Sequence, residues 1–257
     1  MTTSNCCNWI VDGMVQATFG EGVLELREAV EAERAAARLG VPAHKLRSLI
    51  RAGHVHAERR ADRWFVPVVE VRRLEGLPRP NGRPYSTAAA WALLALLADE
   101  RPRGLSAPRL SQLRRQLREA DPRDLAGRLR NRACRRLVFV HPSQVELLAA
   151  DPRVVRSGWG VADQAGAPLL AADDVPVELY VAHGDLDALR DEYLIADASE
   201  VANVVLRIVE DHVAVPHAGG VAATPIVALD LLEAGDPRAV EAAGQLFARI
   251  VQAHRGR

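Results

Sequence analysis

The 257-residue sequence is poor in cysteine and has no long apolar run. Its cysteines, Cys6, Cys7 and Cys134, form neither a disulfide framework nor a CxxC pair of metal-ligand spacing. The longest apolar run, around Ala88 to Ala98, is too short to span a bilayer, and the N-terminus lacks the pattern of a signal peptide. These absences predict a cytoplasmic protein with no membrane partner.

The sequence also lacks the short motifs that commonly carry catalysis or cofactor binding. It contains no GxGxxG, GxxxxGK[ST], HExxH or GxSxG, and its histidines are scattered along the chain. His54 and His56 are expected to be structural. We therefore expect no cofactor, no metal site and no catalytic residue, and a protein that is not an enzyme.

Lysine is almost absent and the formal net charge is zero, yet the charges are unevenly placed. Lys45 is the only lysine, and nearly all other basic residues are arginines. Residues 1–136 carry 25 basic against 15 acidic residues, whereas residues 137–257 carry 8 against 18. A basic front half can bind a polyanion such as DNA while the acidic half stays away from it.

A helix-turn-helix pattern begins near Ala35 and ends at Gly53. Gly40 suits a turn that needs positive φ, and Pro42 suits the first turn of the second helix. One face of that helix is apolar and carries Leu46, Leu49, Ile50 and Gly53. The opposite face carries His44, Arg47, Ser48 and Arg51, so one face is predicted to pack and the other to reach outward.

Two short strands joined by a polar turn are predicted directly after this helix, at residues 55–59 and 64–67. The pattern is typical of a wing. Its tip would carry Arg59, Arg60 and Arg63, which can reach phosphates or the minor groove. Trp64 or Phe65 would seal the small core, and residues 68–74 would form a closing helix.

The segment LGVPAHKLRSLIRAGHVHAERRADRWFVPVVEV resembles the winged helix-turn-helix of the excisionase and MerR-like DNA-binding families. The resemblance implies double-stranded DNA as the partner. Carried over by position, the implied contacts are His44, Lys45, Arg47, Ser48 and Arg51 in the major groove, with Arg59, Arg60 and Arg63 on the wing. Pro42 and Ala43 depart from the family, which usually has a polar pair there. The alternative is an ordinary amphipathic helix pair whose arginines are only solvated.

We expect an α+β fold in five parts. These are a loose leader (1–22), a winged helix-turn-helix domain (23–76), a proline-rich linker (77–84), a basic helical segment (85–136) and an acidic α/β domain (137–257). The helical segment would extend the basic surface, and whether it contacts DNA is left open. Its arginines are Arg109, Arg114, Arg115, Arg118, Arg123, Arg128, Arg130, Arg132, Arg135 and Arg136.

Capping and turn signals predict the remaining elements. In the helical segment, Ser86 would cap a helix to Ala98, Ser106 or Pro108 would begin one through Arg118, and Asp121 would open a third to about Arg132. In the acidic domain, strands are predicted at 137–140, 177–181 and 204–209, and helices at 143–149, 186–194, 225–233 and 238–254.

Two stretches of the acidic domain resemble, in part, the Gly-Ser turn and the carboxylate-bearing strand of a nucleotidyltransferase. They are Ser157-Gly158-Trp159-Gly160 and the strand from Val177. Such enzymes bind Mg²⁺ through two carboxylates that lie two residues apart on one face of a strand. Pro176 stands where the first would be and leaves Glu178 alone, so catalysis is disfavoured. Asp185 and Asp187 are expected to cap a helix.

A second resemblance covers the acidic domain. The order RSGWGVADQAGAPL, VPVELYV, NVVLRIVE and ATPIVALDLLEAGDPRAVEAAGQLFARI is similar to the C-terminal domain of AbiEi-type antitoxins of type IV toxin-antitoxin systems. It implies an autoregulating DNA-binding protein that opposes a nucleotidyltransferase toxin. Because one recognition helix reaches only a few base pairs, a homodimer or repeated half-sites are expected.

The leading hypothesis is therefore a sequence-specific transcriptional regulator in the form of such an antitoxin. One alternative is an excisionase-like architectural factor that directs recombination by bending DNA. The other is a divergent nucleotidyltransferase, with a degenerate fold of that type in the acidic domain.

Overall fold

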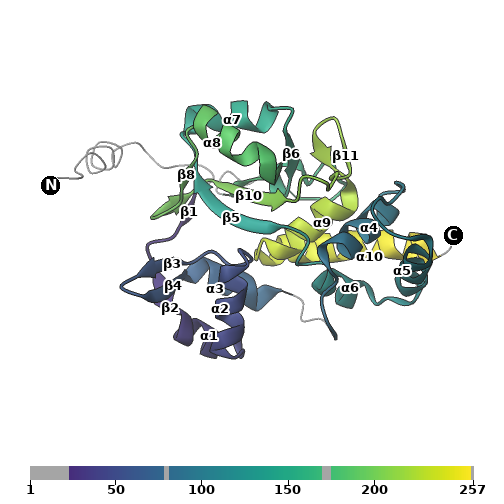
Figure 1. Ribbon diagram of the computed structural model, residues 1–257, viewed down its shortest axis with the longest axis horizontal. Helices are drawn as coiled ribbons and strands as arrows, with labels where there is room; N and C mark the ends of the chain where they lie inside the picture. The colour runs from purple at the N-terminus through teal and green to yellow at the C-terminus, as the bar shows by residue number, and fades with distance from the viewer. Residues whose placement is uncertain (1–22, 78–80, 170–174, 256–257) are drawn as a thin grey trace.

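The computed structural model describes residues 23–77, 81–169 and 175–255, and over these ranges the chain is a mixed α+β protein. Figure 1 shows a small N-terminal module at the lower left, a larger sheet in the middle and a group of helices at the right. The expected α+β class is confirmed. The leader predicted at 1–22 and part of the predicted linker lie outside the described residues. No helix in the described ranges is long and apolar enough to cross a membrane.

The N-terminal module, residues 29–76, consists of three helices and a three-stranded sheet. The helices and the β3–β4 hairpin lie close to where the sequence predicts them. The helices are α1 (Ala32–Leu39), α2 (Ala43–Arg51) and α3 (Val68–Gly76); the sheet has the order β2 (Ala29–Glu31), β4 (Arg63–Pro67), β3 (Glu58–Arg60).

Small and apolar side chains explain how this module packs. Ala36 is buried on α1, where it lets α2 approach closely, and Leu46 and Ile50 are the buried residues of α2. Leu49 packs against the same core while half-buried. Gly40 between the two helices has a φ of 65°, the left-handed conformation that glycine adopts without strain. The predicted apolar face of α2 is confirmed.

The main sheet has seven strands among the described residues, in the order β11-β12-β6-β7-β10-β5-β8. Neighbours β7 and β10 are parallel, and β5 pairs with β10 in the antiparallel direction. The three predicted strands are confirmed, although the first begins earlier, at Cys134. The strands are β5 (Cys134–Phe139), β6 (Val154–Ser157), β7 (Val177–Ala182), β8 (Ala196–Asp197), β10 (Val204–Val209), β11 (His217–Ala218) and β12 (Val221–Ala222).

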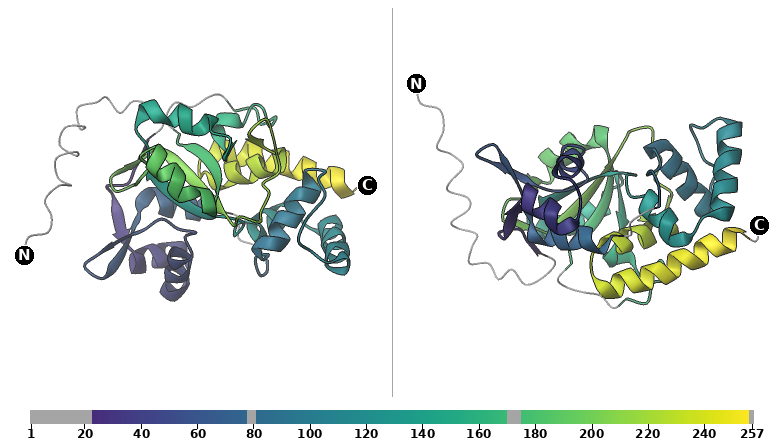
Figure 2. Two further views of the ribbon diagram at one scale, coloured as in Figure 1. Left: turned by 45° about the horizontal axis from the view of Figure 1, so that its top comes forward. Right: turned by 90° about the horizontal axis from the view of Figure 1, so that it is seen from below.

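Helices cover both faces of this sheet (Figures 1 and 2). On one face, α7 (Pro142–Ala150) and α8 (Leu186–Glu192) enclose a core with Leu179, Val204 and Leu206. Asp185 is the N-cap residue of α8 and Asp187 lies in its first turn, as predicted, but the Asp185 side chain makes no capping hydrogen bond. The other face is covered by α9 (Thr224–Glu233), which is buried from Pro225 to Glu233.

The predicted helical segment shares its core with the C-terminal helices. It contains α4 (Thr87–Leu97), α5 (Ala107–Glu119) and α6 (Pro122–Arg128), which pack with α9 and α10 (Pro237–Arg255) in one apolar cluster. Ser86 caps α4 by accepting a hydrogen bond from the Ala89 N–H, as predicted. The third helix ends at Arg128, short of the predicted Arg132, because the chain turns there toward β5.

A short strand ties residues before the N-terminal module to the acidic domain. Residues Leu24–Glu25 (β1) pair with Val201–Ala202 (β9), and Leu26 is buried against Leu137 and Val205 of the main sheet. The sequence predicts these residues as part of the winged helix-turn-helix domain. The structure places them on the α/β body instead, since their apolar side chains find cover there.

Candidate functional site

The outward face of α2 carries the residues that the sequence predicted to contact DNA. His44, Lys45, Ser48 and Arg51 are exposed, while Arg47 is half-buried. Helical periodicity explains this split, because Leu46 and Ile50 hold the opposite face on the core of the module. The five residues predicted for the major groove thus lie together on one helix.

The three positively charged side chains of α2 differ in whether they have a hydrogen-bond or ion-pair partner. The Arg47 guanidinium donates from Nε to the Ala43 carbonyl at 3.4 Å and lies 4.0 Å from Glu33. Lys45 and Arg51 form no ion pair within the described part of the chain. Free cations on an exposed helix face are the groups that can neutralise phosphates.

The predicted wing arginines flank the turn between β3 and β4, and each one is paired with a carboxylate. Arg59 contacts Asp62 at 2.9 Å, Arg60 contacts Glu58 at 2.6 Å, and Arg63 contacts Glu31 at 3.2 Å. All three arginines are exposed. Exposed pairs of this kind contribute little stability, so they can exchange a carboxylate for a phosphate, but at rest they neutralise the wing.

A buried carboxylate lies behind this surface. Glu70 on α3 is 1% exposed and accepts from Arg73 Nε and Nη2, each at 3.1 Å, and from Arg135 Nη1 of β5. Burial would raise the pKa of Glu70, but Arg135 and Arg73 outweigh it and lower the pKa to about 2. A backbone hydrogen bond also connects the N-terminal module to β5 here, because the Arg135 N–H donates to the Gly53 carbonyl at 2.8 Å.

A second buried ion network lies under the main sheet, where α9 faces β7 and β10. Arg132 is 0% exposed and donates to Glu233 at 2.6 Å, to Asp230, and to the Tyr180 hydroxyl at 3.0 Å. Arg207 of β10 contacts Glu178 and Glu233, each at 2.8 Å.

Two carboxylates of this network, Glu233 and Glu178, have shifted pKa values. Burial would raise the pKa of Glu233, but the neighbouring Arg132 and Arg207 lower it to about 2. For Glu178, burial and the nearby Asp230 raise the pKa despite the contact with Arg207. Because the acids and guanidinium groups compensate one another, the network serves to hold these elements together.

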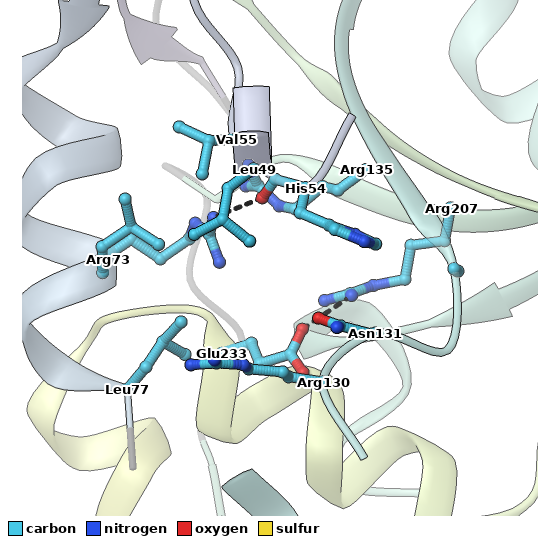
Figure 3. Close-up of a pocket in the computed structure, with 12 residues that line it drawn as sticks. Leu49, His54, Val55, Arg73, Leu77, Arg130, Asn131, Arg135, Arg207 and Glu233 are labelled. Carbon is cyan, nitrogen blue, oxygen red and sulfur yellow. Dashed lines mark hydrogen bonds and ion pairs between the residues drawn. The ribbon is translucent and has the colours of Figure 1, made fainter. Parts of the chain in front are cut away.

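The two networks face each other across a small cavity between the N-terminal module and the main sheet. Figure 3 shows Arg73, Arg130, Arg135, Arg207 and Glu233 around it, with His54 above. Its volume is about 40 Å³, which accommodates a few water molecules and no organic ligand. Burial lowers the pKa of His54, which favours a neutral imidazole there.

The structure corrects the predicted basic surface of residues 109–136. Arg132 and Arg135 are buried in the ion networks, and Arg130 is half-buried at the cavity of Figure 3. Arg128 lies over the Tyr85 ring at 4.1 Å. The exposed members are Arg109, Arg114, Arg115, Arg118, Arg123 and Arg136.

The residues that resemble a nucleotidyltransferase turn belong to the second network. Ser157 donates its hydroxyl to Asp230, and Glu178 is neutralised by Arg207. Gly158 has a φ of 69°, and a Cβ there would lie 2.9 Å from Glu178 Cγ, so only glycine fits. Among the described residues, no three His, Cys, Asp or Glu side chains are grouped so that they could hold a metal ion.

Sequence reasoning missed the ion networks, although a signal for the second one is present. Arg207 interrupts the apolar strand VVLRIV, and Asp230 and Glu233 interrupt the apolar helix TPIVALDLLE. Charged residues in fully apolar elements must find buried partners. No comparable signal marks Glu70, which lies in a helix with charged neighbours.

The chain matches no protein-family model, no curated protein and no solved structure.

Proposed function

We propose that this chain is a DNA-binding transcriptional regulator that reads a short duplex sequence with α2. The observation that carries the proposal is the face of α2, where five predicted contact residues lie side by side and two of the cations, Lys45 and Arg51, have no acidic partner among the described residues. A helix presented in this way fits the major groove, and the β3–β4 hairpin would lie beside the duplex as a wing.

The buried networks support a binding role rather than a catalytic one. A metal-dependent nucleotidyltransferase needs free carboxylate oxygens for Mg²⁺. The candidate carboxylate, Glu178, is 7% exposed and accepts a hydrogen bond from Arg207. The same network supports a rigid α/β body behind the proposed DNA-binding module.

An electrophoretic shift with the DNA upstream of the gene tests the proposal. The wild-type chain should retard this duplex, and Lys45→Ala with Arg51→Ala should abolish the shift, because both cations are exposed and unpaired. Arg249→Ala is the matched control, since Arg249 is equally exposed on α10. Unaltered binding by the double variant would reject α2 as the recognition helix.

The finer proposal is an antitoxin that binds a toxin through the α7–α8 side of the body. The two large apolar side chains exposed among the described residues, Leu147 on α7 and Leu194 after α8, are both on this side. Leu194 is 76% exposed and has a φ of 52°, a strained conformation for leucine. Figure 1 shows α7 and α8 on the side of the sheet away from α1 and α2.

Co-purification with the product of the adjacent gene tests this partner surface. We expect the wild-type chain to retain a nucleotidyltransferase encoded there, Leu194→Asp to lose it, and Lys45→Ala with Arg51→Ala to keep it. Such a pattern would separate toxin binding from DNA binding. Equal retention by Leu194→Asp would contradict the assigned surface.

A further inference from the structure

The largest group of unneutralised positive charge lies outside the N-terminal module, on α5 and its flanking loops. Residues 101–123 carry seven arginines against two acidic residues. None of these seven arginines forms an ion pair with another described residue. Arg128, which follows this stretch, is half-buried and pairs with Asp124. By contrast, all three wing arginines are paired with carboxylates.

The periodicity of α5 gathers three of these arginines on one outward face. Leu113 and Leu117 are buried against the helical core, which fixes the rotation of the helix. Successive residues are rotated by about 100°, so Arg114, Arg115 and Arg118 fall within an arc of about 100° on the solvent side. All three are exposed. We call these three residues the α5 strip.

We propose that the α5 strip is a second nucleic-acid-binding surface, which binds the phosphate backbone of the DNA that flanks the site covered by α2. This inference rests on the proposed function and adds a second surface to it. In Figure 1, α5 lies at the right edge and the N-terminal module at the lower left, so the two surfaces would meet different parts of a duplex. Figure 2 shows the same separation from below.

The chemistry of the strip fits a phosphate backbone better than a protein partner. Besides its arginines, the exposed residues of α5 are Ala107, Pro108, Ser111, Gln112 and one acid, Glu119, at the end of the helix. Neither of the exposed large apolar residues, Leu147 and Leu194, is on this helix. Protein interfaces are built around an apolar core, whereas protein–DNA interfaces are polar and strongly positive. Arginine also binds phosphate in a bidentate manner.

The salt dependence of DNA binding tests the strip directly. The affinity of the full chain for a mixed-sequence duplex about three helical turns long would be measured by fluorescence anisotropy at several KCl concentrations. Each phosphate contact contributes about 0.9 to the slope of log K against log salt. Replacing Arg114, Arg115 and Arg118 together by alanine should lower the magnitude of this slope by about 2 to 3.

Matched variants separate charge from structure. The triple arginine-to-lysine variant keeps the point charges and should keep most of the slope, and Arg249→Ala should leave it unchanged. Alanine favours helix, so α5 should remain folded in the alanine variant, which circular dichroism verifies.

The outcomes distinguish the two proposals. If Lys45→Ala with Arg51→Ala lowers the slope but the triple alanine variant does not, the α5 strip does not contact DNA while the proposed function stands. If the triple alanine variant keeps the slope and loses a protein encoded by the adjacent gene, the strip binds protein and the inference is overturned. If the wild-type chain shows no salt-dependent binding, the proposed function itself fails.

Discussion

At the scale of single residues, Glu70 joins three parts of the protein. Its carboxylate accepts from Arg73 on its own helix, from Arg135 on β5, and from the backbone N–H of His56 at 3.3 Å. Each partner comes from a different segment, so the carboxylate orients α3 and the approach to the β3–β4 hairpin relative to the main sheet. A buried acid with this many donors is costly to lose, because its partners stay buried.

Glu70→Gln is therefore expected to destabilise the protein strongly. Removing one partner of a buried ion pair costs about 3 to 5 kcal/mol, since Arg73 and Arg135 would be left without a counter-charge. Glu75→Gln is the matched control on the same helix: Glu75 is exposed and pairs with Arg38 on the surface, so its loss should change stability little. Urea unfolding of both variants measures the difference, and equal stabilities would contradict the role of Glu70.

The pH dependence of this difference follows from the pKa of Glu70. Its folded-state pKa is about 2, against an ordinary value of 4.5. A lowered pKa gives stability that is fully present above the ordinary value and is lost as the pH falls through the folded value. The gap between wild type and Glu70→Gln should therefore narrow from about pH 4.5 to about pH 2. A constant gap across this window would show that the Glu70 charge is not responsible.

At the scale of elements, the turn after α2 sets how this helix is held against β5 of the main sheet. Gly53 has a φ of 70°, and a Cβ there would lie 2.2 Å from Cys134 Sγ on β5. Gly40, before α2, has a φ of 65° but no atom within 4 Å of such a Cβ. The two glycines therefore share a left-handed φ and differ in how closely they are packed.

Gly40→Ala should cost about 1 to 2 kcal/mol, the strain of a left-handed alanine, and Gly53→Ala should cost clearly more. Adding Cys134→Ala to Gly53→Ala should recover part of the excess, because it removes the clashing sulfur. Thermal unfolding of these variants, together with Cys134→Ala alone, measures this coupling as a double-mutant cycle. Equal costs at the two glycines would contradict the close contact between α2 and β5.

The sequence predicted the longer helices and strands better than the shortest strands. Periodicity located α1, α2, α9 and α10 and the strands β7 and β10, because each has a regular apolar pattern or an apolar run. The short strands β1 and β9 were missed, since two residues are too few to show a pattern. For the candidate site, helical spacing was enough to place the α2 residues on one face. The ion pairs that neutralise the wing arginines could not be predicted in this way, because they depend on side-chain contacts such as Arg63–Glu31.

At the scale of the whole molecule, the uneven charge distribution of the sequence has a buried part and an exposed part. Part of it is internal: Arg132 of the basic half pairs with Asp230 and Glu233 of the acidic half, inside the protein. Another part is exposed, and it includes Lys45 and Arg51 on α2 and the three arginines of the α5 strip. Sequence counting could not separate the two parts, because burial depends on contacts such as Arg132–Glu233, which join residues far apart in the chain.

Selection from a pool of random duplexes tests whether α2 reads duplex DNA, because this experiment assumes no operator. We predict that the wild-type chain enriches a short recurring motif, and that Lys45→Ala with Arg51→Ala retains little DNA and enriches none. A wild-type chain that retains no duplex at low salt, or the same motif enriched by the double variant, would contradict the claim.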